Sequence, residues 1–297
     1  MKLRLAALFL LVCLSACSPK LRFAPGTMPN AETPPAELKT AAEGYVAAHI
    51  DDQNYREVKS GPAVLRVKRS VERLTRGAGY PPGTFPVHLV DAGVEVNAAA
   101  FNGASIVVYE ELLRRVPSDD DLATVIGHEV GHILAKHYTD EAEEKQRASA
   151  VSVGSSILGS AASIAASAAG YSGASDLAGS VTESATGAIG YGAFVGSFNR
   201  TQEYEADHLG LLIMARAGYN PENALRFWSR ADEIFGSSTS SVGSFFSTHP
   251  ASSNRLKSLE EAMPFALAEY KARESVKEPA DTESGKKQKS KNRSKSK

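Results

Sequence analysis

Apolar residues recur every three or four positions along much of the chain, which predicts helices. The pattern is clearest over residues 118–137. Ser118 is a good N-cap, Asp121 follows at the capping-box position, and the first turn is acidic. The apolar stripe of this stretch consists of Leu122, Val125, Ile126, Val130 and Ile133. We expect a largely buried helix here.

Further stretches show the same helical period. Helices are expected within residues 37–76, with a break at Gly61-Pro62, and over residues 199–217, 221–235 and 251–272. The first of these carries Leu38, Ala41, Ala42, Tyr45 and Val46, followed after the break by Val64, Val67, Val71 and Leu74. Gly218 and Pro221 mark the end of one helix and the start of the next.

The period changes to two over residues 86–101 and 104–109, which predicts strands. The expected fold class is therefore α+β, mostly helical, with a small mixed or antiparallel sheet. We place an edge strand at Asn97 to Phe101, where an extended peptide could add as a further strand. An edge strand without any such partner is the alternative.

Residues 148–175 carry no charged side chain. Large apolar residues are sparse and Ser and Gly are frequent across 148–198, so insertion into a membrane would be weak. The spacing of small residues favours tightly packed helices that are buried or cover a cleft. Membrane contact and a mobile lid over a site are the alternatives.

The N-terminus has the pattern of a bacterial lipoprotein signal. Lys2 and Arg4 precede an apolar run, residues 5–14, that is too short to span a membrane. The run leads into Ser15-Ala16-Cys17, which resembles a lipobox with cleavage before the cysteine. An ordinary signal peptide with a coincidental cysteine is the alternative. We therefore expect a signal peptide over 1–16 and a lipidated Cys17.

A proline-containing tether over 17–36 leads to the folded domain, 37–272. Ser18 is not the Asp that retains lipoproteins in the inner membrane, so we expect the outer membrane, periplasmic face. The only other cysteine, Cys13, leaves with the signal peptide, so no disulfide is expected. The Lys-rich tail, 273–297, lacks apolar residues and is expected to be disordered. The net charge of −1 argues against a nucleic-acid partner.

The segment HEVGH supplies the candidate chemistry, with His128 and His132 four residues apart and Glu129 between them. On a helix, four residues turn about 400°, so both imidazoles project from one face. This suits two ligands of one tetrahedral zinc, with Glu129 in reach of a metal-bound water. The short pattern can also arise by chance, but two histidines and a glutamate are costly in a buried helix without a partner.

A third protein ligand is needed. His137 lies about 900° beyond His128 on a continuous helix, so we expect it on the opposite face, at the helix end, against solvent or a carbonyl. Both cysteines are already accounted for, so a thiolate is excluded. The segment EYEAD offers Glu203 and Asp207, and their spacing alone does not decide which binds the metal. Glu205 lies about 200° from Glu203 and should face away.

Four segments in order, 96–113, 118–137, 199–221 and 247–256, resemble the HtpX/BepA/LoiP group of zinc metallopeptidases, which also includes CAAX prenyl endopeptidases. The resemblance implies a zincin-like domain with Glu203 as the third ligand and Asp207 behind the ligands. Substrate or transition-state contacts are implied for Asn97, His249 and Arg255, and strand addition would use Ala98 and Ala99. The one departure, YEELL in place of a Gly before the Leu pair, does not touch the chemistry.

The expected function is zinc-dependent endopeptidase activity, with one zinc ion per chain. Glu129 would act as the general base, and His249 and Arg255 would stabilise the oxyanion. The resemblance implies misfolded or mislocalised envelope proteins as substrates, with the outer-membrane assembly machinery as a possible partner. A zinc-stabilised chaperone or assembly lipoprotein is the alternative. We also expect that His249 can occupy the open position of zinc until substrate arrives.

Overall fold

The structure is a computed structural model, and it describes residues 21–101, 104–138, 198–236, 245, 249 and 253–293, with side chains as far as residue 274. The signal peptide and Cys17 lie outside these ranges, as does nearly all of the Ser- and Gly-rich segment 148–198. The predictions made for them stay predictions.

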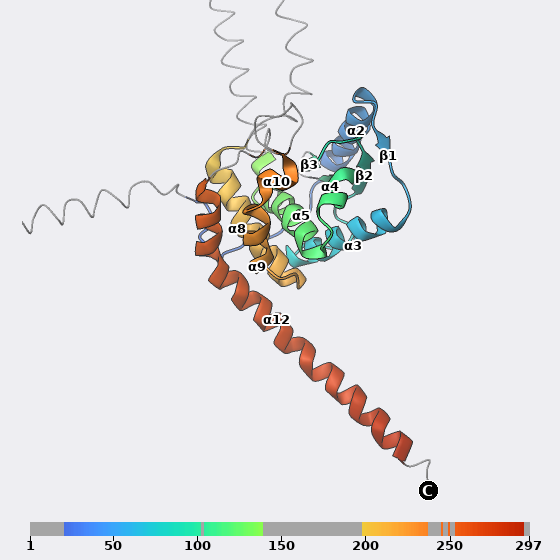
Figure 1. Cartoon of the computed structure of the whole chain (residues 1–297), viewed down its shortest axis with the longest axis vertical. Coiled ribbons are helices and arrows are strands. Elements are labelled where there is room, and N and C mark those ends of the chain that lie inside the picture. The colour runs from blue at the N-terminus through green and yellow to red at the C-terminus, as the bar shows by residue number, and fades with distance from the viewer. Residues whose placement is uncertain are drawn as a thin grey trace, which may run out of the picture.

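A four-stranded mixed sheet lies at one end of the domain (Figure 1). Its order is β1 (Arg56–Glu57), β2 (Val87–Asp91), β4 (Ser105–Tyr109) and β3 (Ala98–Phe101). β2 and β4 run parallel, and the two outer pairs are antiparallel. β3 is an edge strand, as predicted, and the small mixed sheet in a mostly helical domain confirms the expected fold class.

The alternation of side chains along β4 divides the core into two parts. Ile106 and Val108 point into the main core, where α3 (Pro62–Gly77) and α5 (Asp119–Leu134) also lie. Val107 and Tyr109 point the other way, into a smaller cluster with Val46 of α2 (Ala36–Asp52). The period of two therefore gives each face of the sheet its own helical cover.

Two buried helices, α5 and α8 (Arg200–Ala217), carry the segments HEVGH and EYEAD. Ser118 caps α5 as predicted, since its side chain accepts a hydrogen bond of 3.0 Å from the Asp121 amide. Asn199 and Gln202 form a capping box at the start of α8, which the sequence analysis missed. Gly218 ends α8 with φ of 78°, a left-handed conformation that glycine adopts without strain.

Glycine allows α5 and α8 to cross at close range. A Cβ atom on Gly131 would lie 2.6 Å from the Ala206 carbonyl oxygen, and one on Gly210 would lie 3.1 Å from the Gly127 carbonyl carbon. A side chain at Gly131 would therefore push the helices apart. The glycine inside HEVGH thus helps to bring the acidic face of α8 against the histidines of α5.

Shorter helices complete the domain: α4 (Glu110–Arg115), α9 (Glu222–Trp228) and α10 (Ala231–Phe235). The helix predicted over 221–235 is thus two helices, divided at Ser229 and Arg230. The final helix, α12 (Ser253–Arg293), packs on α8 and α9 and then projects far beyond the domain (Figure 1).

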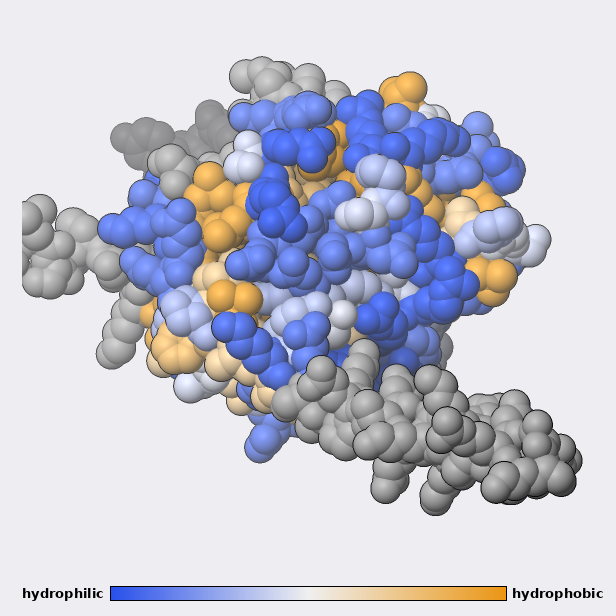
Figure 2. Space-filling model, turned by 60° about the horizontal axis from the view of Figure 1, so that its bottom comes forward, coloured by the Kyte–Doolittle hydropathy of each residue, from blue (hydrophilic) through white to orange (hydrophobic). Residues whose placement is uncertain are grey.

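The backbone of α12 is helical to Arg293, into the stretch from 273 that was expected to be disordered. That expectation, like the other domain bounds, stays a prediction. Among the described residues, no helix has the length and hydropathy to cross a membrane. The domain face in Figure 2 is mostly hydrophilic, with scattered apolar patches.

Candidate metal centre

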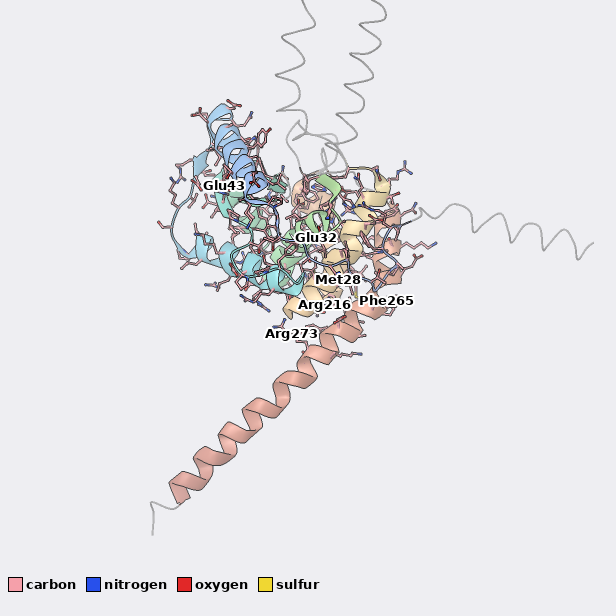
Figure 3. The ribbon with its side chains drawn as sticks, turned by 180° about the vertical axis from the view of Figure 1, so that it is seen from behind. Met28, Glu32, Glu43, Arg216, Phe265 and Arg273 are labelled. Carbon is pink, nitrogen blue, oxygen red and sulfur yellow. The ribbon has the colours of Figure 1, made fainter. Side chains whose placement is uncertain are left out.

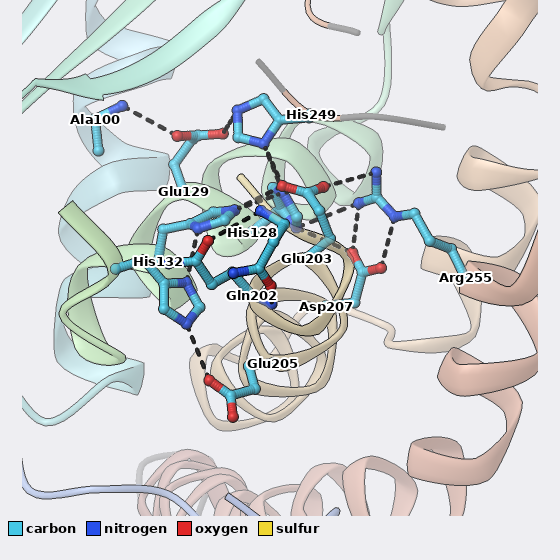
Figure 4. A network of polar contacts seen from close by, with 12 residues as sticks. Ala100, His128, Glu129, His132, Gln202, Glu203, Glu205, Asp207, His249 and Arg255 are labelled. Atoms are coloured by element: carbon cyan, nitrogen blue, oxygen red, sulfur yellow. Dashed lines mark hydrogen bonds and ion pairs between the residues drawn. The ribbon is translucent and has the colours of Figure 1, made fainter. Parts of the chain in front are cut away.

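Four side chains converge between α5, α8 and the segment at His249. The ligand atoms of His128, His132, Glu203 and His249 all lie within 4.8 Å of one another, and this group can hold a metal ion. Figure 4 shows the three imidazoles and the Glu203 carboxylate around one point. The sequence predicted the first three as ligands, and the structure brings them together.

The donor atoms are arranged to bind a cation rather than to form hydrogen bonds with one another. His128 Nε2 lies 3.1 Å from His132 Nε2 and 3.2 Å from His249 Nδ1. His128 and His132 each place their other ring nitrogen against a further partner, so lone pairs face each other at the centre. Glu203 Oε2 is buried and accepts no hydrogen bond of good geometry among the described residues. A bound metal would satisfy all of these atoms.

Asp207 lies directly behind His128. Its Oδ1 atom is 2.9 Å from His128 Nδ1, which fixes the orientation of that ring. Arg255, from α12, donates two hydrogen bonds of 2.7 and 2.8 Å to the Asp207 carboxylate. Its third guanidinium nitrogen lies 3.1 Å from Glu203 Oε2. The guanidinium also lies over the Trp228 ring, 4.1 Å from its centroid. Arg255 thus compensates two buried carboxylates at once.

Glu129, also from α5, faces the site beside His249. Its Oε2 atom accepts hydrogen bonds of 3.0 Å from the Ala100 amide of β3 and 3.1 Å from the Tyr138 hydroxyl. Its Oε1 atom points toward His249, 3.2 Å from Nε2. Tyr138 was not predicted, because its place depends on a turn after α5. Glu129 therefore has one oxygen anchored and one oxygen facing the centre.

His249 bridges the two functional carboxylates. Its Nδ1 atom lies 3.0 Å from Glu203 Oε1, while Nε2 faces Glu129. Phe245 stacks on its ring at 4.3 Å. His128, Glu129, His132, Glu203 and His249 are each at most 1 % exposed, so the centre is closed to solvent. The sequence placed His249 in the site, and its position agrees with occupation of a fourth ligand position.

His137 lies elsewhere than predicted. It is fully buried, and its Nδ1 atom is 2.8 Å from His132 Nδ1. The prediction assumed that the helix continues, whereas α5 ends at Leu134 and Lys136 adopts φ of 58°, which turns the chain back. Glu205 does face away from the metal position, but it is buried there against His137, 3.0 Å from Nε2.

Burial and charge set the protonation states of the ligands. Burial lowers the pKa of His132 well below its usual value, which favours the neutral imidazole that binds metals. Burial alone would raise the pKa of Glu203, but His249 and Arg255 bring it well below its usual value. Burial would lower the pKa of His249, yet Glu129 and Glu203 raise it. The site therefore offers an ionised carboxylate and a neutral imidazole to a cation.

The predicted substrate-binding residues lie along the edge of β3. Asn97 precedes the strand, and its side-chain oxygen accepts a 2.8 Å hydrogen bond from the Ala98 amide. Ala99 pairs in register with Val107 of β4. Both the Ala98 and the Ala100 amide thus donate hydrogen bonds to side chains. The bond from Ala100 to Glu129 links the strand directly to the metal centre. The edge strand and the metal centre are neighbours.

Comparison with known sequences agrees with this geometry. A model of peptidase family M48 matches residues 64–263. The mitochondrial metalloendopeptidase OMA1 of Schizosaccharomyces pombe is 28% identical over 69% of this chain and 54% of its own. The beta-barrel assembly-enhancing protease of Yersinia pestis is 32% identical over 62% of this chain and 35% of its own. That of Escherichia coli K12 is 30% identical over 54% and 31%. The chain thus spans about a third to a half of the length of these relatives.

Proposed function

This chain belongs to peptidase family M48, and on that premise we propose that it is a zinc-dependent metalloendopeptidase. The observation that carries the proposal is the convergence of His128, His132 and Glu203 beside a second carboxylate, Glu129, which accepts a hydrogen bond from the Ala100 amide. Two imidazoles and one carboxylate are a donor set of catalytic zinc sites. A site that only stored metal would not need Glu129.

When bound, zinc supplies Lewis acidity, which polarises a substrate carbonyl and acidifies a water molecule. Glu129 takes the proton from the attacking water on its Oε1 atom and later delivers it to the leaving amine. The hydrogen bonds from Ala100 and Tyr138 hold the Oε2 atom, so the free oxygen stays aimed at the centre. Asp207 keeps the His128 ring in one orientation and one tautomer.

In this arrangement, His249 would hold the fourth ligand position of a bound metal and keep the site latent. Its imidazole lies between Glu203 and Glu129, in the space that water and the scissile carbonyl need. Substrate must therefore displace it. Once displaced, His249 is a candidate to stabilise the oxyanion. The same role for Arg255 stays a prediction, and its contacts with Asp207 and Glu203 support a second role in holding those carboxylates.

Latency has a direct test in the affinity for a peptide hydroxamate, which needs open positions at the metal. The variant His249→Ala should bind the hydroxamate more tightly than the wild-type protein does, while its zinc content stays close to one per chain. Equal affinities in the two proteins, with zinc present in both, would contradict a blocking role for His249.

Substrate would bind as an added strand along β3. The amides of Ala98 and Ala100 already donate to side chains at the edge, and a peptide would take over these positions with its own carbonyl groups. Backbone hydrogen bonds hold a peptide independently of its sequence, which suits unfolded proteins. At Ala100 the peptide would compete with Glu129, whose Oε2 atom would keep the hydrogen bond from the Tyr138 hydroxyl.

The setting that we propose is the bacterial envelope. The lipobox-like sequence at Cys17 supports a lipid anchor in the outer membrane, on its periplasmic face. Arg22, five residues later, already contacts α8, so the anchor would hold the domain within about 17 Å of the membrane surface. The likeness to the beta-barrel assembly-enhancing protease of Yersinia pestis supports misassembled β-barrel proteins of the envelope as substrates, and their assembly machinery as a partner.

The test is digestion of casein and of a misfolded β-barrel protein by the full chain, with and without a chelator. We expect cleavage that the chelator abolishes and that added zinc restores. The alternative is a zinc-stabilised chaperone or assembly lipoprotein, which the four protein donors favour, since structural zinc sites are closed in this way. Protection of the barrel protein from aggregation without any cleavage would support that alternative.

A further inference from the structure

A chain of hydrogen bonds runs from the metal centre to the N-terminal segment. His132 directs its Nδ1 atom, the nitrogen that faces away from the centre, to His137 Nδ1 at 2.8 Å. His137 Nε2 then lies 3.0 Å from Glu205 Oε2. Both partners are buried, with His137 fully enclosed and Glu205 2 % exposed. Neither belongs to the group of metal donors.

The chemistry of imidazole fixes the direction of these hydrogen bonds. A metal takes the lone pair of His132 Nε2, so the ring proton of the neutral imidazole must sit on Nδ1, which donates to His137. His137 Nδ1 therefore accepts, and its own proton must lie on Nε2, where it donates to the Glu205 carboxylate. Glu205 thus selects the tautomer of His137, and His137 selects the tautomer of His132.

The chain path after α5 creates this arrangement. The helix ends at Leu134, and the left-handed Lys136 turns the backbone so that His137 returns beneath His132. Lys136 is held on the outside by an ion pair of 2.7 Å with Glu32. Glu205 reaches the same place from α8, on the side of that helix opposite Glu203 (Figure 4).

The N-terminal segment closes the far end. The backbone amide of Arg22 donates to Glu205 Oε1, so both carboxylate oxygens have a donor. The Arg22 guanidinium donates to the Ala135 carbonyl oxygen at 2.6 Å, in the turn that leads to His137. Further along, Gly26 packs against the Phe265 ring of α12, and Figure 3 shows Met28, Glu32 and Phe265 on this rear face. The N-terminal segment therefore packs against the folded domain through specific contacts.

We propose that His137 and Glu205 are positioning residues for His132, and that the segment at Arg22 completes them. They hold the imidazole of His132 in the tautomer and orientation that metal binding requires, as Asp207 does for His128. Partners of this kind typically change metal affinity about 10- to 100-fold when they are removed. The inference rests on the proposed metal site, but it does not require peptide hydrolysis.

The experiment measures zinc affinity of the full chain by chelator competition and the visible spectrum of the cobalt-substituted protein. His137→Phe keeps a buried ring and removes both nitrogens. His137→Gln restores an acceptor and a donor on one side chain. His208→Phe is the matched control, because His208 is also a buried histidine, on α8, but its hydrogen bonds go to Ser258 rather than to a metal ligand. The melting temperature of each metal-free protein reports on folding.

We expect His137→Phe to lose about 10- to 100-fold in zinc affinity and to shift the cobalt spectrum. His137→Gln should recover most of the affinity, and His208→Phe should match the wild-type protein. Equal zinc affinities in His137→Phe and His208→Phe would overturn the inference. If His137→Phe does not fold, a wild-type spectrum and affinity in Glu205→Gln would overturn it instead. Absence of zinc binding in the wild-type protein would count against the proposed function itself.

Discussion

The two histidines of α5 are oriented by different means. His128 contacts a carboxylate directly, and Arg255 from α12 locks that carboxylate in place. His132 reaches its carboxylate, Glu205, only through a second imidazole, and the backbone at Arg22 holds the far oxygen. We call these the Arg255 side and the His137 side.

The difference between the sides lies in how charge is balanced. On the Arg255 side, one buried guanidinium compensates Glu203 and Asp207, and loss of one partner leaves uncompensated charge in the interior. On the His137 side, a neutral imidazole relays the effect of one carboxylate, so loss of a link breaks hydrogen bonds. The first side should therefore dominate folding stability, and the second should act mainly on metal binding.

The largest effect is expected from Arg255→Leu in the metal-free protein. Two buried carboxylates lose their cation, which should lower the free energy of unfolding by about 3–5 kcal/mol in chemical denaturation. A bound metal compensates Glu203, so the loss should shrink when zinc is present. The control Arg230→Leu breaks an exposed pair and should cost less than about 1 kcal/mol. Equal losses in both variants would remove the charge-balance argument.

On the His137 side, a substitution should lower stability most when zinc is bound, whereas on the Arg255 side it should do so most in the metal-free protein. Free zinc at about a thousand times its dissociation constant should stabilise the wild-type protein by about 4 kcal/mol. At the same zinc concentration, His137→Phe should lose about 1.4–2.7 kcal/mol of this gain, which corresponds to 10- to 100-fold weaker binding. Thermal melts with and without chelator measure both quantities. The same zinc-dependent gain in both proteins would show that the His137 side does not serve the metal.

A smaller difference should separate the two carboxylates. Asp207→Asn removes a direct partner of His128 and should weaken zinc binding by up to about 100-fold. Glu205→Gln acts through His137 and should weaken it by about tenfold. Isothermal titration of the metal-free variants ranks them. A larger loss in Glu205→Gln than in Asp207→Asn would reverse the comparison.

The smallest effect is expected at the N-terminal end. Arg22→Pro removes both the backbone donor to Glu205 and the guanidinium, whereas Arg22→Ala removes only the guanidinium. The proline variant should be less stable than the alanine variant by about 1 kcal/mol, the worth of one hydrogen bond, in the same denaturation experiment. No difference between the two variants would show that the amide contributes nothing to the His137 side.

On the Arg255 side, the family resemblance placed Asp207 behind the ligands but gave Arg255 to the oxyanion rather than to Asp207. On the His137 side, neither contact was predicted. Residues four apart on a helix share a face, so HEVGH and EYEAD could be read as one site. His137 could not be placed, because no sequence pattern predicts the left-handed conformation of Lys136. Beyond that turn, helical spacing no longer gives the direction of a side chain. The prediction that Glu205 faces away from the metal is correct. Its partners were not predicted, because His137 and Arg22 come from two distant segments. Contacts of this kind depend on how elements pack.

The fold shows the same division. Periodicity and caps predicted α5, the end of α8 and the edge strand β3, since these depend on neighbouring residues. The close approach of α5 and α8 rests on Gly131 and Gly210, whose partners lie on another helix. Tyr138 and Arg22 likewise reach the site through tertiary contacts. Sequence reasoning thus identified the donors but not most of what orients them.

The most direct test of the account compares wild-type protein with Glu129→Gln in zinc content and in cleavage of an unfolded substrate. Glu129 contacts Ala100, Tyr138 and His249 but is not needed as a metal donor. The variant should therefore keep one zinc ion per chain and lose about 10²- to 10⁴-fold in hydrolysis rate. Undiminished cleavage by a zinc-loaded Glu129→Gln protein would contradict the assignment of this centre as the site of peptide hydrolysis.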